Sequence, residues 1–300
     1  MLLRYLAYAL TVIWLTHALW PQPAHAQQAP TPVSQCQAIA AAAPAASFAS
    51  FSVPAAVPVA SADTGEVTIT FVGHSTFLIE TPDGVSIATD YNGWFRTPSA
   101  LIETPDGVSI ATDYNGWFRT PSAPDVVTMN RAHSSHYTLS PDPAIEHVLH
   151  GWRDDGTPAD HDLVVGDAYI RNVTTDIRSG FEGMIPDANS IFIFEVAGLC
   201  IGHLGHLHHE LDESHYRQIG RLDVLMVPVD GGLTMGAESM SRVVSRLRSA
   251  LILPMHRPLT NDFLAMFGDE FDKSFATEPS VKVSLRSLPK RPLIYVLQGV

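Results

Sequence analysis

The feature that most constrains the fold of this chain is an exact tandem repeat. The segment "LIETPDGVSIATDYNGWFRTPSA" occupies residues 78–100 and again residues 101–123, without a single difference. Each copy holds a Pro-Asp-Gly turn followed by an alternating, β-branched run, which is typical of a β-hairpin. Identity this complete indicates a recent duplication or a sequence error and not an ancient repeat architecture. A fold that needs one hairpin at this point must therefore accommodate two.

The first copy is expected to form the core hairpin. It continues from an alternating run that begins near Glu66, so its strands can pair locally at the lowest loop-closure cost. The second copy leads into Pro124 and must supply the connection to the next strand. The intervening residues are expected to form either an extra hairpin on a sheet edge or a bulged loop, and the sequence leaves both open.

Composition indicates a globular protein and limits its partners. A chain of 300 residues with 46% hydrophobic residues can bury a substantial core in one large domain or two small ones. Eighteen basic residues against 31 acidic ones leave a formal charge of −13. This charge repels phosphate backbones and anionic lipids, so we expect no nucleic-acid partner. Nothing in the sequence fixes the oligomeric state.

The first residues predict export. Arg4 precedes an apolar run that leads to Ala24-His25-Ala26, a small-x-small cleavage pattern. We therefore expect a signal peptide over residues 1–26, a periplasmic or secreted location, and no stable membrane anchor after cleavage. An uncleaved anchor is the weaker alternative, because Thr and His interrupt the run. Residues 27–62, rich in Ala, Pro, Ser and Gln, predict a poorly ordered leader, and the folded domain is expected over residues 63–300.

Two cysteines could form a disulfide in such a protein. An oxidising compartment permits Cys36 and Cys200 to pair, which would attach the N-terminal segment to the core. A buried Cys200 with a free Cys36 is the open alternative, because a sequence gives no distance between them.

Three predicted strands end in histidine. They are the runs "VVTMN" before "RAHSSH", "LCIGH" before "LGH", and "LILPM" before "H". A strand at "LDVLMVP" and a helix at "AESMSRVVSRLRS" precede the last of them. Ligand sites in layered α/β folds lie at the carboxyl ends of strands, so these histidines are expected to gather there. The run "PAIEHVLHGW" predicts an amphipathic helix that carries His147 and His150.

The order of five short motifs extends this pattern. From about Glu66 onward, "GHST", "TDY", "RAHSSH", "GHLGH" and "PMH" follow one another. This series resembles the metallo-β-lactamase superfamily of metal-dependent hydrolases, and within it the branch of the sugar-phosphate lactonases. The resemblance implies an α/β fold, a four-layer αββα sandwich of two mixed β-sheets flanked by helices.

The resemblance also implies a metal site, which departs from the family pattern. His133, His136, His203, His206 and His256 are the implied ligands. The family loop His-x-His-x-Asp-His places Arg131 at its first histidine and Ser135 at its aspartate, while His206 replaces the bridging aspartate. A neutral imidazole offers one lone pair where a carboxylate can bridge two ions, so a mononuclear site is expected. The imidazole-rich set favours Zn²⁺, with another imidazole-preferring divalent metal as the alternative.

The remaining site residues follow from the same resemblance. His74 and Asp230 would line the mouth of the site as proton shuttles, and Asp90 or its duplicate Asp113 would orient a ligand histidine. Arg131 would bind an anionic substrate group. The implied function is an exported hydrolase that uses a metal-bound hydroxide on an ester, lactone or phosphoester of a small molecule. The alternative is a catalytically inactive binding protein of the same fold, because two ligands of the family loop are lost.

Overall fold

The computed structural model describes residues 34–37, 65–73, 75–83, 86–89, 109–112, 124–132, 136–179 and 183–298. All of them lie in the larger of the two units into which the chain divides, Val33–Val300. The expected signal peptide and most of the leader fall outside the described residues, as do His74, Asp90, Asp113 and His133. Within the described ranges, no helix is long and apolar enough to cross a membrane.

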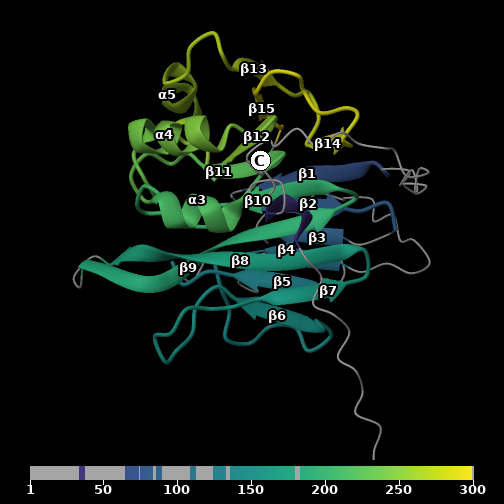
Figure 1. Cartoon of the computed structure of the whole chain (residues 1–300), viewed down its shortest axis with the longest axis vertical. Coiled ribbons are helices and arrows are strands. Elements are labelled where there is room, and N and C mark those ends of the chain that lie inside the picture. Colours follow the sequence, from purple (N-terminus) through teal and green to yellow (C-terminus); the bar gives the residue numbers. More distant parts are fainter. Residues whose placement is uncertain are drawn as a thin grey trace, which may run out of the picture. The chain divides into compact units, whose positions relative to one another are not determined.

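The first of two mixed β-sheets has the strand order β14-β1-β2-β3-β4-β5-β6 (Figure 1). The strands β14, β1, β2 and β3 pair antiparallel, whereas β3, β4, β5 and β6 pair in parallel. Their bounds are β1 Val67–Gly73, β2 Thr76–Glu80, β3 Ser86–Thr89, β4 Ser109–Thr112, β5 Val126–Met129, β6 His147–His150 and β14 Ser280–Val283.

The duplicated segment contributes two neighbouring strands to this sheet. The strands β3 and β4 are the two copies of "SIAT", and they pair in parallel with Ser86 opposite Ser109. Because β3 also pairs antiparallel with β2, the first copy forms the expected core hairpin. The second copy is neither an edge hairpin nor a bulged loop, since β4 lies between β3 and β5. The segment 90–108 between β3 and β4 exceeds the dozen or so residues that a connection between parallel strands needs. The chain can therefore place β4 parallel to β3.

The second sheet has the order β13-β15-β12-β11-β10-β9-β8-β7. Its first five strands pair in parallel, and β10, β9, β8 and β7 pair antiparallel. The bounds are β7 Asp162–Val165, β8 Ala168–Ser179, β9 Gly183–Val196, β10 Leu199–His203, β11 Val224–Pro228, β12 Leu251–Met255, β13 Asp272–Phe275 and β15 Leu293–Val296.

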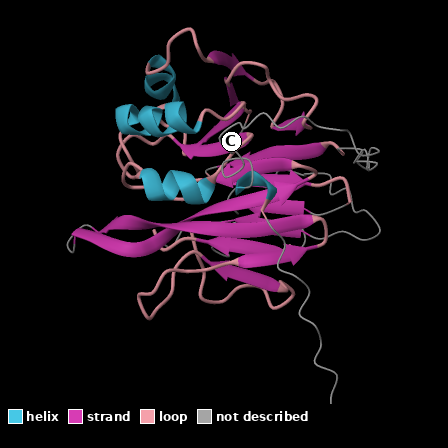
Figure 2. Ribbon diagram, in the orientation of Figure 1, coloured by secondary structure: helices cyan, strands magenta, loops and turns pink. Residues whose placement is uncertain are grey.

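Alternation along the strands makes two layers of core. On β11, Val224 and Met226 join residues of the first sheet in one buried cluster, whereas Leu225 and Val227 join a second cluster. That second cluster contains buried side chains of α3 (Glu213–Ile219), α4 (Ala237–Leu247) and α5 (Thr260–Ala265). The helices therefore cover the outer face of the second sheet (Figure 2). Two packed mixed sheets with flanking helices confirm the expected α/β sandwich.

One predicted helix is a strand. Residues 147–150 form β6, in which His147 lies opposite Val126 of β5 and the His147 N–H donates to the Asp125 carbonyl at 2.8 Å. The apolar run is too short for its periodicity to distinguish a helix from a strand. The open edge of β5 offers backbone partners, and this tertiary pairing decides the conformation.

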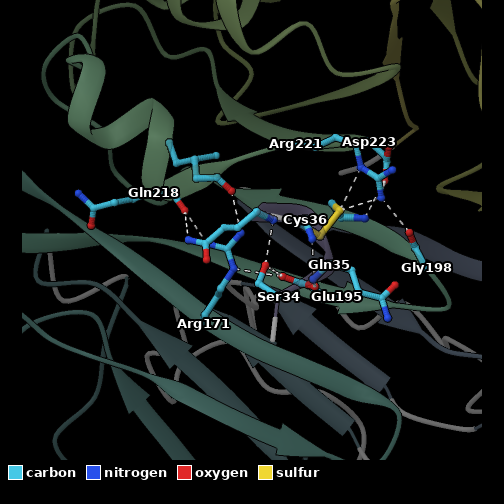
Figure 3. Close-up of a disulfide and its surroundings, with 12 residues drawn as sticks. Ser34, Gln35, Cys36, Arg171, Glu195, Gly198, Gln218, Arg221 and Asp223 are labelled. Atoms are coloured by element: carbon cyan, nitrogen blue, oxygen red, sulfur yellow. Dashed lines mark hydrogen bonds and ion pairs between the residues drawn. A yellow bond between two sulfur atoms is a disulfide. The ribbon is translucent and has the colours of Figure 1, made fainter. Parts of the chain in front are cut away.

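A short N-terminal segment is fastened to the second sheet (Figure 3). Cys36 forms a disulfide with Cys200 of β10, with 5.9 Å between their Cα atoms. Both cysteines are buried. The pairing was one of two open alternatives, and it joins residues that stand 164 positions apart.

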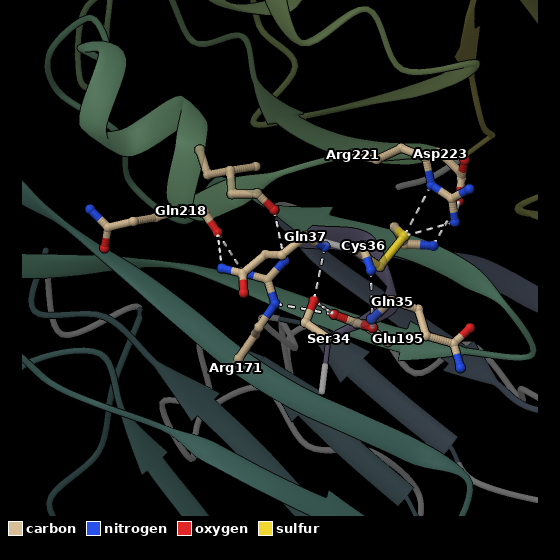
Figure 4. A network of polar contacts seen from close by, with 11 residues as sticks. Ser34, Gln35, Cys36, Gln37, Arg171, Glu195, Gln218, Arg221 and Asp223 are labelled. Carbon is tan, nitrogen blue, oxygen red and sulfur yellow. Dashed lines mark hydrogen bonds and ion pairs between the residues drawn. A yellow bond between two sulfur atoms is a disulfide. The ribbon is translucent and has the colours of Figure 1, made fainter. Parts of the chain in front are cut away.

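A polar network holds the same segment in place (Figure 4). Glu195 of β9 accepts the Gln35 N–H at 2.9 Å and forms a buried ion pair with Arg171 of β8 at 3.1 Å. The Ser34 hydroxyl also donates to Glu195. The Arg171 guanidinium donates to the carbonyls of Gln218 and Ile219, which end α3. The N-terminal segment is thus tied to two strands and a helix.

Candidate metal centre

Five buried polar side chains lie at or after the carboxyl ends of four strands, one in the first sheet and three that are neighbours in the second. The loop after β5 carries His136, and β10 ends at His203 with His206 three residues later. Asp230 follows β11, and His256 comes directly after β12. The three histidines of the first two loops are 0% exposed, His256 is 6% exposed and Asp230 is 8% exposed. Burying so many imidazoles costs free energy in a core that serves packing alone, so the arrangement indicates a functional site.

Three of the imidazole rings contact one another. The ring centroids of His136 and His206 are 4.7 Å apart, those of His136 and His256 are 5.1 Å apart, and those of His206 and His256 are 5.6 Å apart. The rings come from three different loops, so only the tertiary fold unites them. His203 lies on the adjoining strand end, where its Nδ1 accepts the Gly205 N–H at 3.2 Å.

Asp230 is the carboxylate of the cluster. Its Oδ1 accepts the N–H groups of Gly232 at 3.1 Å and Thr234 at 2.8 Å, and also the Thr234 hydroxyl at 3.0 Å. Its Oδ2 lies 3.9 Å from Nδ1 of His256 and accepts no hydrogen bond from the described residues. One oxygen therefore holds the loop, while the other faces the imidazole.

The backbone of His256 has a conformation that is strained for a residue other than glycine. Its φ is +50°, in the left-handed region that non-glycine residues seldom occupy. Such conformations cluster at functional sites, where the surrounding fold over-determines them. Met255 pairs opposite Pro228 in the β-ladder immediately before this residue, so the chain turns sharply at the strand end.

Two buried asparagines, neither of them predicted from the sequence, hold the histidine loops in place. Asn130 accepts the Ser190 N–H at 2.6 Å, and its own N–H contacts the His136 carbonyl at 3.4 Å, closing the loop after β5. Asn189 accepts the His206 N–H at 2.7 Å and donates to the Thr175 hydroxyl at 2.8 Å. Both amide side chains form hydrogen bonds to β8, β9 or the loops, and these bonds fix the positions of the two histidine loops.

A clamp also holds the loop that carries Asp230. Nη2 of Arg178, near the end of β8, donates to the carbonyls of Gly232 at 2.7 Å, Leu233 at 3.2 Å and Thr234 at 3.1 Å. His208 contacts the Leu233 carbonyl at 2.7 Å. His208 therefore acts on this loop, while His206, two residues earlier, points into the imidazole cluster.

The structure brings together part of the predicted site. His136, His206, His256 and Asp230 meet, and His203 ends the adjoining strand. Arg131 is exposed on the loop after β5, where its N–H donates to the Ala188 carbonyl at 3.2 Å. Its role in substrate binding stays a prediction. The predictions for His74, Asp90 and His133 fall on residues outside the described ranges.

Comparison with known proteins decides the family. Residues 68–256 match the family described as the beta-lactamase superfamily domain, and this range runs from β1 to the last histidine of the cluster, before β13, β14 and β15. The chain belongs to the metallo-β-lactamase superfamily.

Several known proteins are similar to this superfamily member. A UPF0173 metal-dependent hydrolase of Methanoculleus marisnigri is 24% identical over 181 residues, which are 55% of this chain and 79% of that protein. A solved structure from Thermotoga maritima, assigned to the Zn-dependent hydrolases of the metallo-β-lactamase superfamily, has 23% identity and a TM-score of 0.50. That match covers 78% of this chain and 100% of the other. A metal-dependent hydrolase of Parabacteroides distasonis matches with 14% identity and a TM-score of 0.49, over 68% and 90% of the two chains.

The donor atoms of this superfamily member are of types that suit a divalent metal, but the described side chains are not arranged around a common point. Imidazole nitrogens beside a buried carboxylate oxygen are the donor types that zinc and similar ions take. Among the described residues, however, no three such side chains are placed around one point. The rings of His136 and His256 stack with 17° between their planes, and a lone pair lies in the plane of its ring. These rings must turn about their side-chain bonds before both can bind one ion.

Proposed function

We propose that this protein is an exported, metal-dependent hydrolase with a histidine-rich, mononuclear centre. The observation that carries the proposal is the mutual contact of the His136, His206 and His256 rings beside Asp230 at the strand ends. Membership of the superfamily supports a divalent metal, and the metal-dependent hydrolase of Methanoculleus marisnigri supports hydrolysis. We propose zinc as the metal and an ester, lactone or phosphoester of a small molecule as the substrate.

The residues of the cluster have separate roles in this proposal. Three imidazoles would hold the ion, which matches a known catalytic pattern of three histidines with one open position. When bound, the ion supplies a Lewis acid and lowers the pKa of water toward ~7. Asp230 orients His256 through Oδ2 while Oδ1 keeps the loop in place. Oδ2 is also the atom that can accept a proton during hydrolysis, because it accepts no hydrogen bond from the described residues.

Export is a proposal that rests on two features. The first residues have the pattern of a signal peptide, and the buried disulfide between Cys36 and Cys200 suits an oxidising compartment. Cleavage after Ala26 would keep Cys36 in the mature chain. N-terminal sequencing of protein recovered from the periplasm or medium tests this part, and a mature chain that still begins at Met1 would contradict it.

Metal content is the test of the function itself. The mature protein, produced in an oxidising compartment, is analysed by plasma mass spectrometry and assayed on 4-nitrophenyl acetate, a simple lactone and bis(4-nitrophenyl) phosphate. We expect about one zinc or similar ion per chain and hydrolysis of at least one of the three, as for a mononuclear centre. The variants His206→Ala and His256→Ala should lose both the ion and the activity.

A histidine outside the cluster provides the control. His209 lies three residues after His206, and its Nε2 accepts the Asp176 N–H at 3.0 Å. His209→Ala should keep the ion. Well-folded protein without stoichiometric metal would refute the hydrolase proposal and favour an inactive binding protein of the same fold.

A further inference from the structure

A large cavity adjoins the imidazole cluster. Its volume is about 810 Å³, within the usual range for small-molecule sites, and Asp230 and His256 form part of its wall. The rest of the wall comes from β1, from the start of α5 and from the ends of β13 and β15. Among these residues are Phe71, Leu233, Arg257, Phe275, Val296 and Leu297.

The cavity is mostly apolar, and so is its exposed part. Phe71, Val296 and Leu297 are buried in its wall. Leu233 is 62% exposed and Phe275 is 61% exposed. Large apolar side chains that stay exposed around a concave site mark a surface that binds an apolar group. The cavity therefore suits the hydrocarbon part of a ligand.

One cation lies in this apolar wall. The guanidinium carbon of Arg257 is 4.2 Å from the centroid of the Phe71 ring, and Nη1 donates to the Leu297 carbonyl. Within the described part of the chain, Arg257 forms no ion pair, and it is the only arginine or lysine that lines the cavity. Burial lowers the pKa of its guanidinium, yet arginine keeps its proton at neutral pH.

The orientation of Arg257 is fixed while part of its donor fork stays open. The stacking on Phe71 and the bond to Leu297 hold the plane of the guanidinium. Nε and Nη2 donate to no acceptor among the described residues. Such a planar fork matches a carboxylate in two parallel hydrogen bonds. Arg257 follows His256 in the chain, so a group held by it lies next to the imidazole cluster.

We propose that the substrates are small organic acids with an apolar body, whose single carboxylate binds Arg257 while the reacting bond lies at His256 and Asp230. The inference rests on the proposed hydrolase function and names its substrate class. A wall that holds one guanidinium, Arg257, and one carboxylate, Asp230, suits a monoanion better than a doubly charged phosphate, particularly in a protein whose formal charge is −13. The sequence suggested that Arg131 binds the anionic group of the substrate. Arg131 does not line the cavity, whereas Arg257 does, so Arg257 takes this role in the proposal.

Binding of a non-hydrolysable pair of compounds tests the inference. The probes are 4-phenylbutyrate and its neutral isostere 4-phenylbutanamide, titrated into the mature protein by calorimetry. Each titration is run with and without zinc, because a carboxylate can also bind a metal. In both states the acid should bind about 10-fold or more tightly than the amide, the gain expected of a charged hydrogen bond.

Three variants assign this preference to one residue. Arg257→Gln should bind acid and amide equally in the zinc-free state, and Arg257→Lys should keep part of the preference as a point charge. Arg286 is exposed and does not line the cavity, so Arg286→Gln makes the same change of charge and should behave like the wild type. Thermal melting of each variant shows whether it is folded.

The outcomes separate this inference from the proposed function. Equal or absent binding of the two probes by wild-type protein, or a preference that persists in folded Arg257→Gln, would overturn the inference. A protein that takes up zinc and hydrolyses esters without this preference would keep only the proposed function. A protein that prefers the acid through Arg257 but takes up no metal would keep only the anion site.

Discussion

Asn189 holds the backbone of His206: its Oδ1 accepts the His206 N–H at 2.7 Å, and both residues are fully buried. The same amide donates to the Thr175 hydroxyl at 2.8 Å. One side chain of β9 therefore links strand β8 to a loop of the imidazole cluster. Mutation of a group that orients a ligand residue typically lowers metal affinity or activity by about 10–100-fold.

Replacement of this amide should weaken both the fold and the metal site. Asn189→Ala leaves the His206 N–H buried without its acceptor, so the free energy of unfolding should fall by about 1–3 kcal/mol. Metal affinity should fall by about 10–100-fold, because the loop is no longer held. Denaturant unfolding and competition with a zinc chelator measure the two effects.

Asn172 offers a matched control for this variant. It lies on β8, donates to the Ser190 hydroxyl at 2.9 Å and accepts the His161 N–H at 2.7 Å. Asn172→Ala should cost a similar amount of stability and leave metal affinity within about twofold, because it touches neither loop of the cluster. Equal loss of affinity in both variants would show that Asn189 acts only through overall stability.

Gly205 is required by both conformation and space. Its φ is +58°, and an added Cβ would lie 2.4 Å from Nδ2 of Asn130 and 2.5 Å from Oδ1 of Asn189. Gly205→Ala should therefore lower the free energy of unfolding by about 2–5 kcal/mol, through left-handed strain and overpacking. Metal uptake should be lost with it. At Gly232 an added Cβ meets nothing within 4 Å, so Gly232→Ala should change stability by less than about 0.5 kcal/mol.

The disulfide should carry a large share of the stability. It closes a segment of 164 residues, and cross-links of that span restrict the unfolded chain strongly. Reduction, or the double variant Cys36→Ala and Cys200→Ala, should lower the free energy of unfolding by about 2–5 kcal/mol. Unfolding in urea with and without a reductant measures the difference. Ser34→Ala is the control, since it removes one bond to Glu195 and keeps the disulfide; equal stability of oxidised and reduced protein would refute the prediction.

The sequence predicted the strands that end in histidine because each is a continuous apolar run followed directly by the polar residues. The buried runs of β5, β10 and β12, and the helix α4 between β11 and β12, all form as expected. The prediction of a helix at β6 was wrong. A run of four residues has no distinctive periodicity, and pairing with the neighbouring strand β5 determines its conformation.

The central position of β4 was equally out of reach of the sequence. Two identical copies compete for one place in a sheet, and only the pairing of whole strands decides between edge and centre. Asn130 and Asn189 were not predicted because a buried amide has no sequence signature. Each acts by a hydrogen bond to a backbone group that is distant in the sequence. Arg257 was missed for a similar reason, since the apolar wall around it comes from strands that follow it in the chain as well as from Phe71.

His150, at the end of β6, should make stability depend on pH. Its ring stacks on Trp152 with 4.7 Å between centroids, and burial lowers its pKa from the ordinary value of 6.5, opposed in part by Asp154. Just below pH 6.5, His150 is therefore protonated in the unfolded chain but remains largely neutral in the folded protein. The free energy of unfolding should fall as pH drops through 6.5, by at most about 1.4 kcal/mol per pH unit, and level off below the lowered pKa. His150→Gln should remove this part of the slope, and a variant as pH-dependent as the wild type would show that other histidines cause it.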